Sequence, residues 1–219
     1  MADNLPRKSN LRLILLAMLV GAISAVGGIS FWHVMQGQNS QSFASLMVLP
    51  EPKVIADFDL VDGEGKTFSL ENMKGQWSLV FFGFTNCPDV CPSALYDLNL
   101  ISEALANRRG KRPIEHQVVF ISVDPERDTP EKLAKYVAYF NPDFAGVTGA
   151  PEQLAALTKQ LGIAWELEEH EPGAEQYAVF HTSSVMVFNP HGQMFGVFPA
   201  PHDAEKMADE LADAIKNDT

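Results

Sequence analysis

The sequence WSLVFFGFTNCPDVCP, residues 77–92, decides both the fold and the chemistry of this chain. Residues 77–84 are almost all apolar or aromatic, as in a strand that is covered on both faces. This strand runs into Cys87 and Cys91, and the apolar residues that follow recur at helical spacing up to residue 107. The pattern therefore predicts two cysteines between a buried strand and the start of a helix.

The rest of the chain supplies further elements around this unit. Short strands are expected at 54–60 and 67–70, a second buried strand at 117–123, and a hairpin of 184–188 with 193–198. Capping and breaking residues predict helices at 129–140, 151–162 and 203–216. This order predicts an α/β fold, a thioredoxin-like central sheet with helices on both faces, preceded by one transmembrane helix.

The transmembrane prediction rests on an uncharged run near the amino terminus. Residues 13–32 contain no charge, and a helix of this length spans about 30 Å, the hydrocarbon thickness of a bilayer. Arg7, Lys8 and Arg12 precede the run, and positive residues stay on the cytoplasmic side. A cleavable signal peptide is the alternative, although its apolar region is usually shorter. The expected organisation is a cytoplasmic segment at 1–12, a transmembrane anchor at 13–35, a linker at 36–50 and a folded domain at 51–219.

The charge of the chain argues against nucleic-acid binding. The formal net charge is -12, and residues 1–36 carry a local +2, so the remainder carries -14. Such an acidic body repels phosphate backbones, and no basic stripe interrupts it. The acidity fits a solvated surface, or else a cationic partner or a metal. With 46% hydrophobic residues, the chain can also bury a core.

The cysteine pair is open to three interpretations. A thiolate at a helix start is stabilised by the helix dipole, so a thiol pKa of about 8.5 can fall toward neutrality, and such a cysteine attacks disulfides or binds soft metals. The pair has i,i+4 spacing, with a rise of about 6 Å on a helix, so a reversible disulfide is possible but strained, and the pair can also chelate one metal ion. A purely structural disulfide is the third interpretation, but so short a loop removes little chain entropy.

Three motifs together resemble the Sco/SenC family of copper proteins. They are FGFTNCPDVCP at 82–92, VDPERDTP at 123–130 and HTS at 181–183. The resemblance covers roughly residues 50–215. It implies a thioredoxin-like fold that binds one copper ion through two thiolates and an imidazole and helps to assemble the binuclear copper centre of cytochrome c oxidase. The metal ligands that it implies are Cys87, Cys91 and His181, with the two cysteines also forming a redox-active pair.

The donor set agrees with copper as the metal. Two thiolates favour Cu(I), and an added imidazole allows Cu(II) as well, although zinc accepts the same ligands. The family commonly has an acidic residue immediately before the histidine, whereas here that position is Phe180, which is expected to weaken Cu(II) binding more than Cu(I) binding. Asp124 and Arg127 match the second motif, and they either serve the site or fix an ordinary loop. The other histidines are expected to be surface or core residues: His33, His116, His170, His191 and His202.

These observations predict a copper chaperone rather than an enzyme. It would deliver copper by ligand exchange to the copper-site subunit of cytochrome c oxidase, from an inner-membrane anchor with the domain facing the periplasm. A copper donor and a thiol reductant are further expected partners. The alternative is a thiol-disulfide reductase that keeps the cysteines of the oxidase site reduced, which needs Cys87 and Cys91 but not His181. A sensor is disfavoured because the residues before the anchor contain no signalling domain.

Overall fold

The computed structural model describes residues 14–19, 21, 24, 27, 28, 43–107 and 112–217. The chain separates into two compact units, Met1–Ser42 and Phe43–Thr219, and the described residues of the first unit are helical. Within the described ranges, no helix combines the length and the apolar character that crossing a bilayer requires. The predicted segment at 1–12 and most of the predicted anchor at 13–35 lie outside the described residues.

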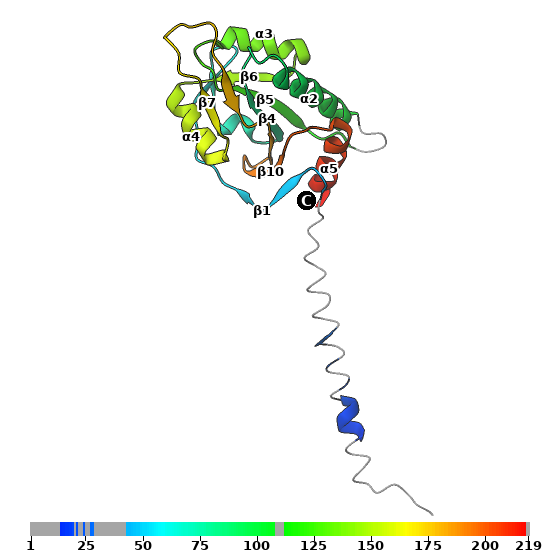
Figure 1. Ribbon diagram of the computed structural model, residues 1–219. Helices are drawn as coiled ribbons and strands as arrows, with labels where there is room; N and C mark the ends of the chain where they lie inside the picture. The colour runs from blue at the N-terminus through cyan, green and yellow to red at the C-terminus, as the bar shows by residue number, and fades with distance from the viewer. Residues whose placement is uncertain are drawn as a thin grey trace, which may run out of the picture. The chain divides into compact units, whose positions relative to one another are not determined.

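The second unit is built on a mixed sheet of eight strands, in the order β1-β10-β9-β4-β5-β6-β2-β3 (Figure 1). Its central strands β4, β5 and β6 are parallel, and β9 lies antiparallel beside β4. The strands are β1 Met47–Lys53, β2 Leu60–Asp62, β3 Thr67–Phe68, β4 Trp77–Gly83, β5 His116–Ser122, β6 Ala145–Thr148, β9 Val185–Phe188 and β10 Met194–Phe198. A separate sheet pairs β7, Trp165–Leu167, with β8, Val179–His181, in antiparallel orientation.

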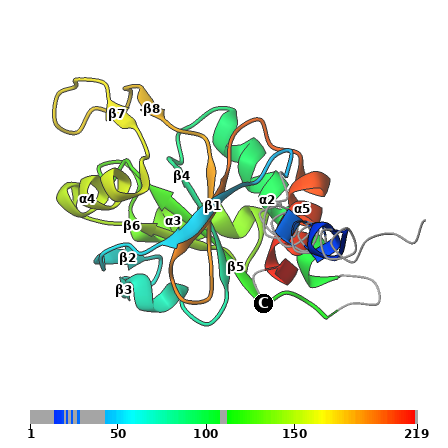
Figure 2. The ribbon, with the colours of Figure 1, turned by 90° about the horizontal axis from the view of Figure 1, so that it is seen from below.

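Helices cover both faces of the large sheet. The side chains of β4 alternate between two core clusters, with Leu79 and Phe81 in one and Val80 and Phe82 in the other. The first cluster includes the apolar faces of α2 (Val90–Ala106), α3 (Pro130–Phe140) and α5 (Ala204–Asn217), and the second includes that of α4 (Pro151–Leu161). Figure 2 shows α4 on one side of the sheet and α2 with α5 on the other. The predicted α/β sheet with helices on both faces is confirmed.

Local sequence signals explain the best-predicted elements. All seven residues of β4 are buried, as the apolar run indicated. The Thr129 side chain accepts a hydrogen bond from the Lys132 backbone N–H at the start of α3, where Pro130 occupies the first turn. The helix α4 ends at Gly162, which adopts the left-handed conformation with φ of 71°. The hairpin of β9 and β10 is present as predicted.

The observed strands differ from the predictions in three places. Residues 54–59 do not form a strand, and the N–H of Ala56 there donates to the Gln160 side chain instead of to a sheet neighbour. Residues 47–50, assigned to the linker at 36–50, belong to β1 because this segment pairs with β10. The strands β6, β7 and β8 were not predicted, since runs of three or four residues carry little periodicity.

Candidate metal centre

Three side chains converge beyond the carboxyl end of β4. Cys87 lies in the loop after β4, Cys91 in the first turn of α2, and His181 at the end of β8. Their two sulfur atoms and an imidazole nitrogen all lie within 4.8 Å of one another, and Cys91 Sγ is 3.5 Å from His181 Nε2. Both cysteines are free thiols. Two soft sulfur donors and one imidazole therefore meet closely enough to hold a single metal ion.

The three residues predicted as ligands are thus the residues that the fold brings together. Among the described residues, no other group of three or more His, Cys, Asp and Glu side chains lies close enough together to hold a metal ion. His116 contacts Ser102 and the Ile114 carbonyl instead, and His33 lies outside the described residues. Phe180, the residue immediately before His181, is 64% exposed to solvent.

Burial governs the chemistry of the two cysteines. Cys91 is fully buried and Cys87 is half-buried. Burial raises the pKa of the Cys91 thiol, because it removes the water that would solvate the thiolate. The hydrogen bond with the Phe84 backbone lowers this pKa, but by less than burial raises it. The expectation that the helix start lowers the thiol pKa is therefore wrong for Cys91, because desolvation outweighs the favourable amides. A metal ion that binds Cys91 must displace its proton.

The imidazole of His181 is held in a defined orientation. Its Nδ1 lies 3.2 Å from the Thr182 carbonyl, so a neutral ring that donates from Nδ1 leaves the lone pair of Nε2 facing Cys91. Burial lowers the pKa of His181, opposed by the hydrogen bond to Thr182, and a lower pKa favours this neutral form. Phe81 and Phe84 contact the ring edge to face, at centroid distances of 6.0 and 5.9 Å. The ring is therefore ready to donate to a metal.

His181 is presented by the small two-stranded sheet rather than by the large one. It lies opposite Trp165 on β7, and Thr182 N–H donates to the Ala164 carbonyl at 2.9 Å. The Trp165 indole N–H donates to the Thr158 hydroxyl of α4 at 2.9 Å, and this bond attaches the β7–β8 hairpin to the rest of the domain. A shallow hollow of about 300 Å³ beside His181 is lined by Ala164, Trp165, Glu166, Phe180, His181 and Thr182. Apart from the motif at 181–183, no sequence pattern indicated the pairing of β7 with β8.

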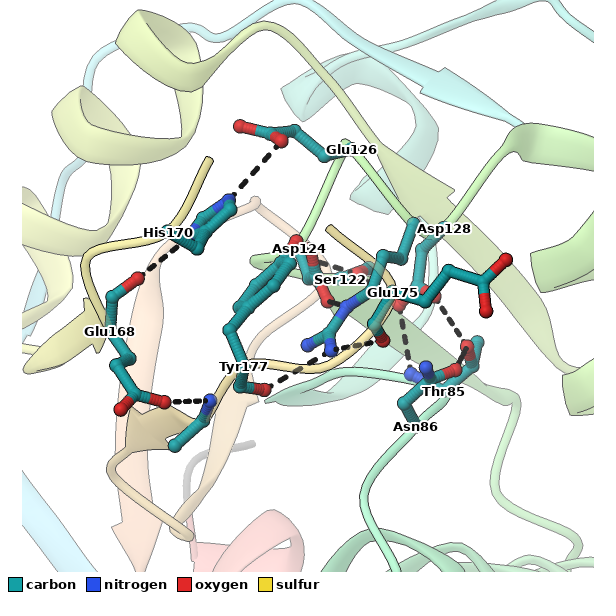
Figure 3. A network of polar contacts seen from close by, with 12 residues as sticks. Thr85, Asn86, Ser122, Asp124, Glu126, Asp128, Glu168, His170, Glu175 and Tyr177 are labelled. Carbon is teal, nitrogen blue, oxygen red and sulfur yellow. Dashed lines mark hydrogen bonds and ion pairs between the residues drawn. The ribbon is translucent and has the colours of Figure 1, made fainter. Parts of the chain in front are cut away.

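The second motif forms a polar turn whose contacts are shown in Figure 3. Asp124 and Asp128 are both fully buried, and neither belongs to the group of possible metal ligands. Asp124 accepts from Arg127 Nε at 2.6 Å and from the Tyr177 hydroxyl. Of the two roles left open for Asp124, these contacts favour the fixing of loops over direct contact with a metal.

The sequence also matches known proteins over the whole domain. The family model described as SCO1/SenC matches residues 48–216. The chain belongs to the SCO1/SenC family. The SCO2-like protein of Rickettsia conorii is 33% identical over 159 residues, which cover 73% of this chain and 76% of that protein. The family membership inferred from the three motifs is confirmed.

Solved structures of the SCO1/SenC family share the fold. The copper-bound structure of ScoI from Arabidopsis thaliana is 30% identical, has a TM-score of 0.68, and matches over 74% of this chain and 98% of that one. The copper-bound structure of yeast Sco1 is 30% identical with a TM-score of 0.69, over 75% and 90% of the two chains. The thioredoxin-like sheet described above is therefore the family fold.

The close approach of β4 to α2 yields a first prediction. A Cβ atom on Gly83 would lie 2.7 Å from Cys91 Sγ and 2.8 Å from Phe120 Cε2, and both of these side chains are fully buried. We expect Gly83→Ala to lower the free energy of unfolding by about 1–3 kcal/mol, because such overpacking forces buried neighbours to move. Denaturant unfolding of the reduced domain measures the change. Phe120→Leu in the same chain should recover part of the loss, and an unchanged midpoint for Gly83→Ala would contradict the predicted clash.

Proposed function

We propose that this chain binds copper through Cys87, Cys91 and His181 and delivers it to the binuclear copper centre of cytochrome c oxidase. The observation that carries the proposal is the convergence of two sulfurs and one imidazole nitrogen within 4.8 Å. The copper-bound structures of related family members, and the preference of thiolates for copper, support the choice of metal.

Delivery by ligand exchange fits the burial of the ligands. Cys91 is fully buried, whereas Cys87, in the loop before α2, and His181, at the end of β8, are both half-buried. An acceptor ligand can therefore replace one of the two half-buried donors first, while Cys91 and the remaining donor still hold the ion. The ion is a cargo in this scheme, and the thiols regain protons as it leaves. Exchange of one ligand for another requires no change in the oxidation state of copper.

The second candidate, a thiol-disulfide reductase, is favoured by the two free thiols with Cys87 accessible. In this reaction Cys87 attacks a target disulfide and forms a mixed disulfide, which Cys91 then resolves to release the reduced target. The Cys87–Cys91 disulfide that results must be reduced by an external thiol donor. Burial raises the pKa of Cys91, which suits a resolving thiol better than an attacking one. Such a cycle makes no use of His181.

The two candidates differ in what they expect of His181→Ala. For copper delivery, the variant keeps two thiolates for Cu(I) but loses a donor needed for Cu(II), so Cu(II) affinity should fall by about tenfold or more beyond any change for Cu(I). Copper titration of the reduced domain in each oxidation state measures this, together with oxidase assembly at limiting copper. His191→Ala removes an exposed histidine from the β9–β10 turn and is the matched control.

The outcome for the reductase differs in two readouts. If the protein acts only as a reductase, His181→Ala should reduce disulfides and support oxidase assembly to the same extent as the parent protein. Parent-like Cu(II) affinity and parent-like assembly in His181→Ala would together remove His181 from the ligand set and favour the reductase.

The exposed Phe180 allows a separate test of the charge at the site. In Phe180→Asp, a carboxylate next to His181 adds negative charge, which favours Cu(II) over Cu(I) because the attraction scales with the charge of the ion. We expect the affinity for Cu(II) to rise by only about three- to tenfold, because solvent screens a charge at this exposed position. Phe180→Asn removes the ring without adding charge and should not tighten binding. Equal Cu(II) affinities for the two variants would contradict a role for this charge.

We further propose that the domain is anchored in the inner membrane and faces the periplasm. The support is the uncharged run at 13–32 behind Arg7, Lys8 and Arg12. Reporter fusions placed after residue 45 should be active only in the periplasm. Cytoplasmic activity would contradict the orientation, and a mature protein that begins after residue 25 would contradict the anchor.

A further inference from the structure

The turn formed by residues 124–128 contacts the chain segments that lead into both halves of the metal centre. The cysteines belong to the loop and helix that follow β4, whereas His181 belongs to the separate β7–β8 sheet. In the described part of the chain, β8 pairs with β7 alone. The separation between the imidazole and the sulfurs therefore depends on contacts that join the small sheet to the rest of the domain. Figure 3 shows Asp124 and Tyr177 on one side of this turn and Asp128 with Thr85 on the other.

One side of the turn holds the cysteine loop through Asp128. Its buried carboxylate accepts from the Thr85 N–H at 2.8 Å, from the Thr85 hydroxyl, and from Ser122 Oγ at 2.6 Å. Lys132 Nζ lies 3.1 Å from the same carboxylate and 3.0 Å from Asn86 Oδ1. Thr85 and Asn86 immediately precede Cys87, so these bonds fix the start of the loop that carries both sulfurs.

The other side of the turn holds the segment that leads into β8. Arg127 Nη1 donates to the carbonyls of Glu175 and Tyr177, at 3.3 and 3.1 Å, while its Nε pairs with Asp124. The guanidinium also lies over the Tyr177 ring, 3.5 Å from its centroid, and the Tyr177 hydroxyl donates to Asp124. Tyr177 is four residues before His181. The side chain of Arg127 is about nine-tenths buried, so this ion pair is poorly screened by solvent.

Two aromatic contacts extend this side of the turn. The His170 ring stacks on Tyr177 with centroids 3.6 Å apart and 6° between the planes, and its Nε2 lies 3.3 Å from Glu126. Arg127 also lies 5.8 Å from the centroid of Phe84, which itself contacts the His181 ring. The turn therefore reaches the imidazole through packed side chains as well as through the backbone.

We propose that residues 124–128 act as a two-armed clamp that sets the distance between His181 and the cysteine pair. Asp128 is the positioning residue of the loop arm. Arg127 and Tyr177, joined by Asp124, are the positioning residues of the hairpin arm. The metal-related part of this inference rests on the proposed copper site, and the geometric part concerns the apo domain alone.

The two arms are expected to affect copper differently. Release of the hairpin arm withdraws the imidazole and leaves both sulfurs in place, so Cu(II) binding should weaken while Cu(I) binding persists. Release of the loop arm displaces the sulfurs, so both oxidation states should bind less tightly. Changes in residues that orient metal ligands typically cost about 10–100-fold in affinity.

The experiment compares Arg127→Gln and Tyr177→Phe in the hairpin arm with Thr85→Val in the loop arm. The control is Lys66→Ala, which removes an exposed ion pair with Glu64. Cu(I) and Cu(II) affinities are measured together with the visible absorption that thiolates give to Cu(II). In the apo protein, amide hydrogen exchange is followed at Thr182 and Glu168, whose N–H groups donate to the Ala164 and Ala178 carbonyls across the hairpin.

Support for the clamp has three parts. The hairpin-arm variants should lose about tenfold or more in Cu(II) affinity with little change for Cu(I), and exchange at Thr182 and Glu168 should quicken by about tenfold or more. Thr85→Val should weaken both oxidation states and leave the hairpin amides protected. In a His181→Ala background, Arg127→Gln should cause no further loss of Cu(II) affinity, because the hairpin arm acts through this imidazole.

Other outcomes overturn the clamp or the copper site separately. The clamp would be overturned if the parent protein binds copper and both hairpin-arm variants keep its Cu(II) affinity and its amide hydrogen-exchange rates. A parent protein that fails to bind copper would overturn the proposed function, while the exchange data would still test the geometry. Tyr177→Phe keeps the aromatic stack and loses only the hydrogen bond to Asp124, so it decides the matter if Arg127→Gln does not fold.

Discussion

A carboxylate without access to water must obtain donors from the protein, and Asp128 obtains them from three separate elements. Thr85 belongs to the loop after β4, Ser122 ends β5, and Lys132 lies in the first turn of α3. Because an unpaired buried charge is costly, the loop after β4 cannot move away from β5 and α3 without a large loss of stability. The electrostatic demand of Asp128, which is not among the possible metal ligands, thus helps to fix the start of the loop that carries the cysteines.

The small β7–β8 sheet places His181, the proposed third ligand, outside the main sheet. The separation between the imidazole and the sulfurs is therefore set by side-chain contacts, among them those of Trp165 and Arg127, and not by pairing with the main sheet. A donor on a separate element can leave the ion while the sulfurs still hold it, which suits an ion that must be both held and released. The same arrangement would give a permanent structural site no advantage.

Local signals in the sequence explain how much could be predicted. The buried run of β4, the cap at Thr129 and the stop at Gly162 act over a few residues, and the elements that they indicated are present. Cys87 and Cys91 could be singled out by their position between a strand and a helix. His181 could be selected from six histidines through the family resemblance and through its place just before the predicted hairpin, and not from a strand pattern, because β8 is only three residues long. The stacking of His170 on Tyr177 arises from tertiary contacts alone and has no sequence signal.

Charge and softness act in opposite directions at this centre. Thiolates are soft donors and favour Cu(I), but two thiolates with Cu(I) leave a net charge of -1, whereas with Cu(II) and a neutral imidazole the centre is neutral. Burial penalises a net charge, and the raised pKa of Cys91 is the apo form of the same penalty. Arg127 does not offset the negative charge, since it already pairs with Asp124. Ligand softness thus favours Cu(I) and desolvation favours Cu(II), so we expect a single set of three donors to accommodate both.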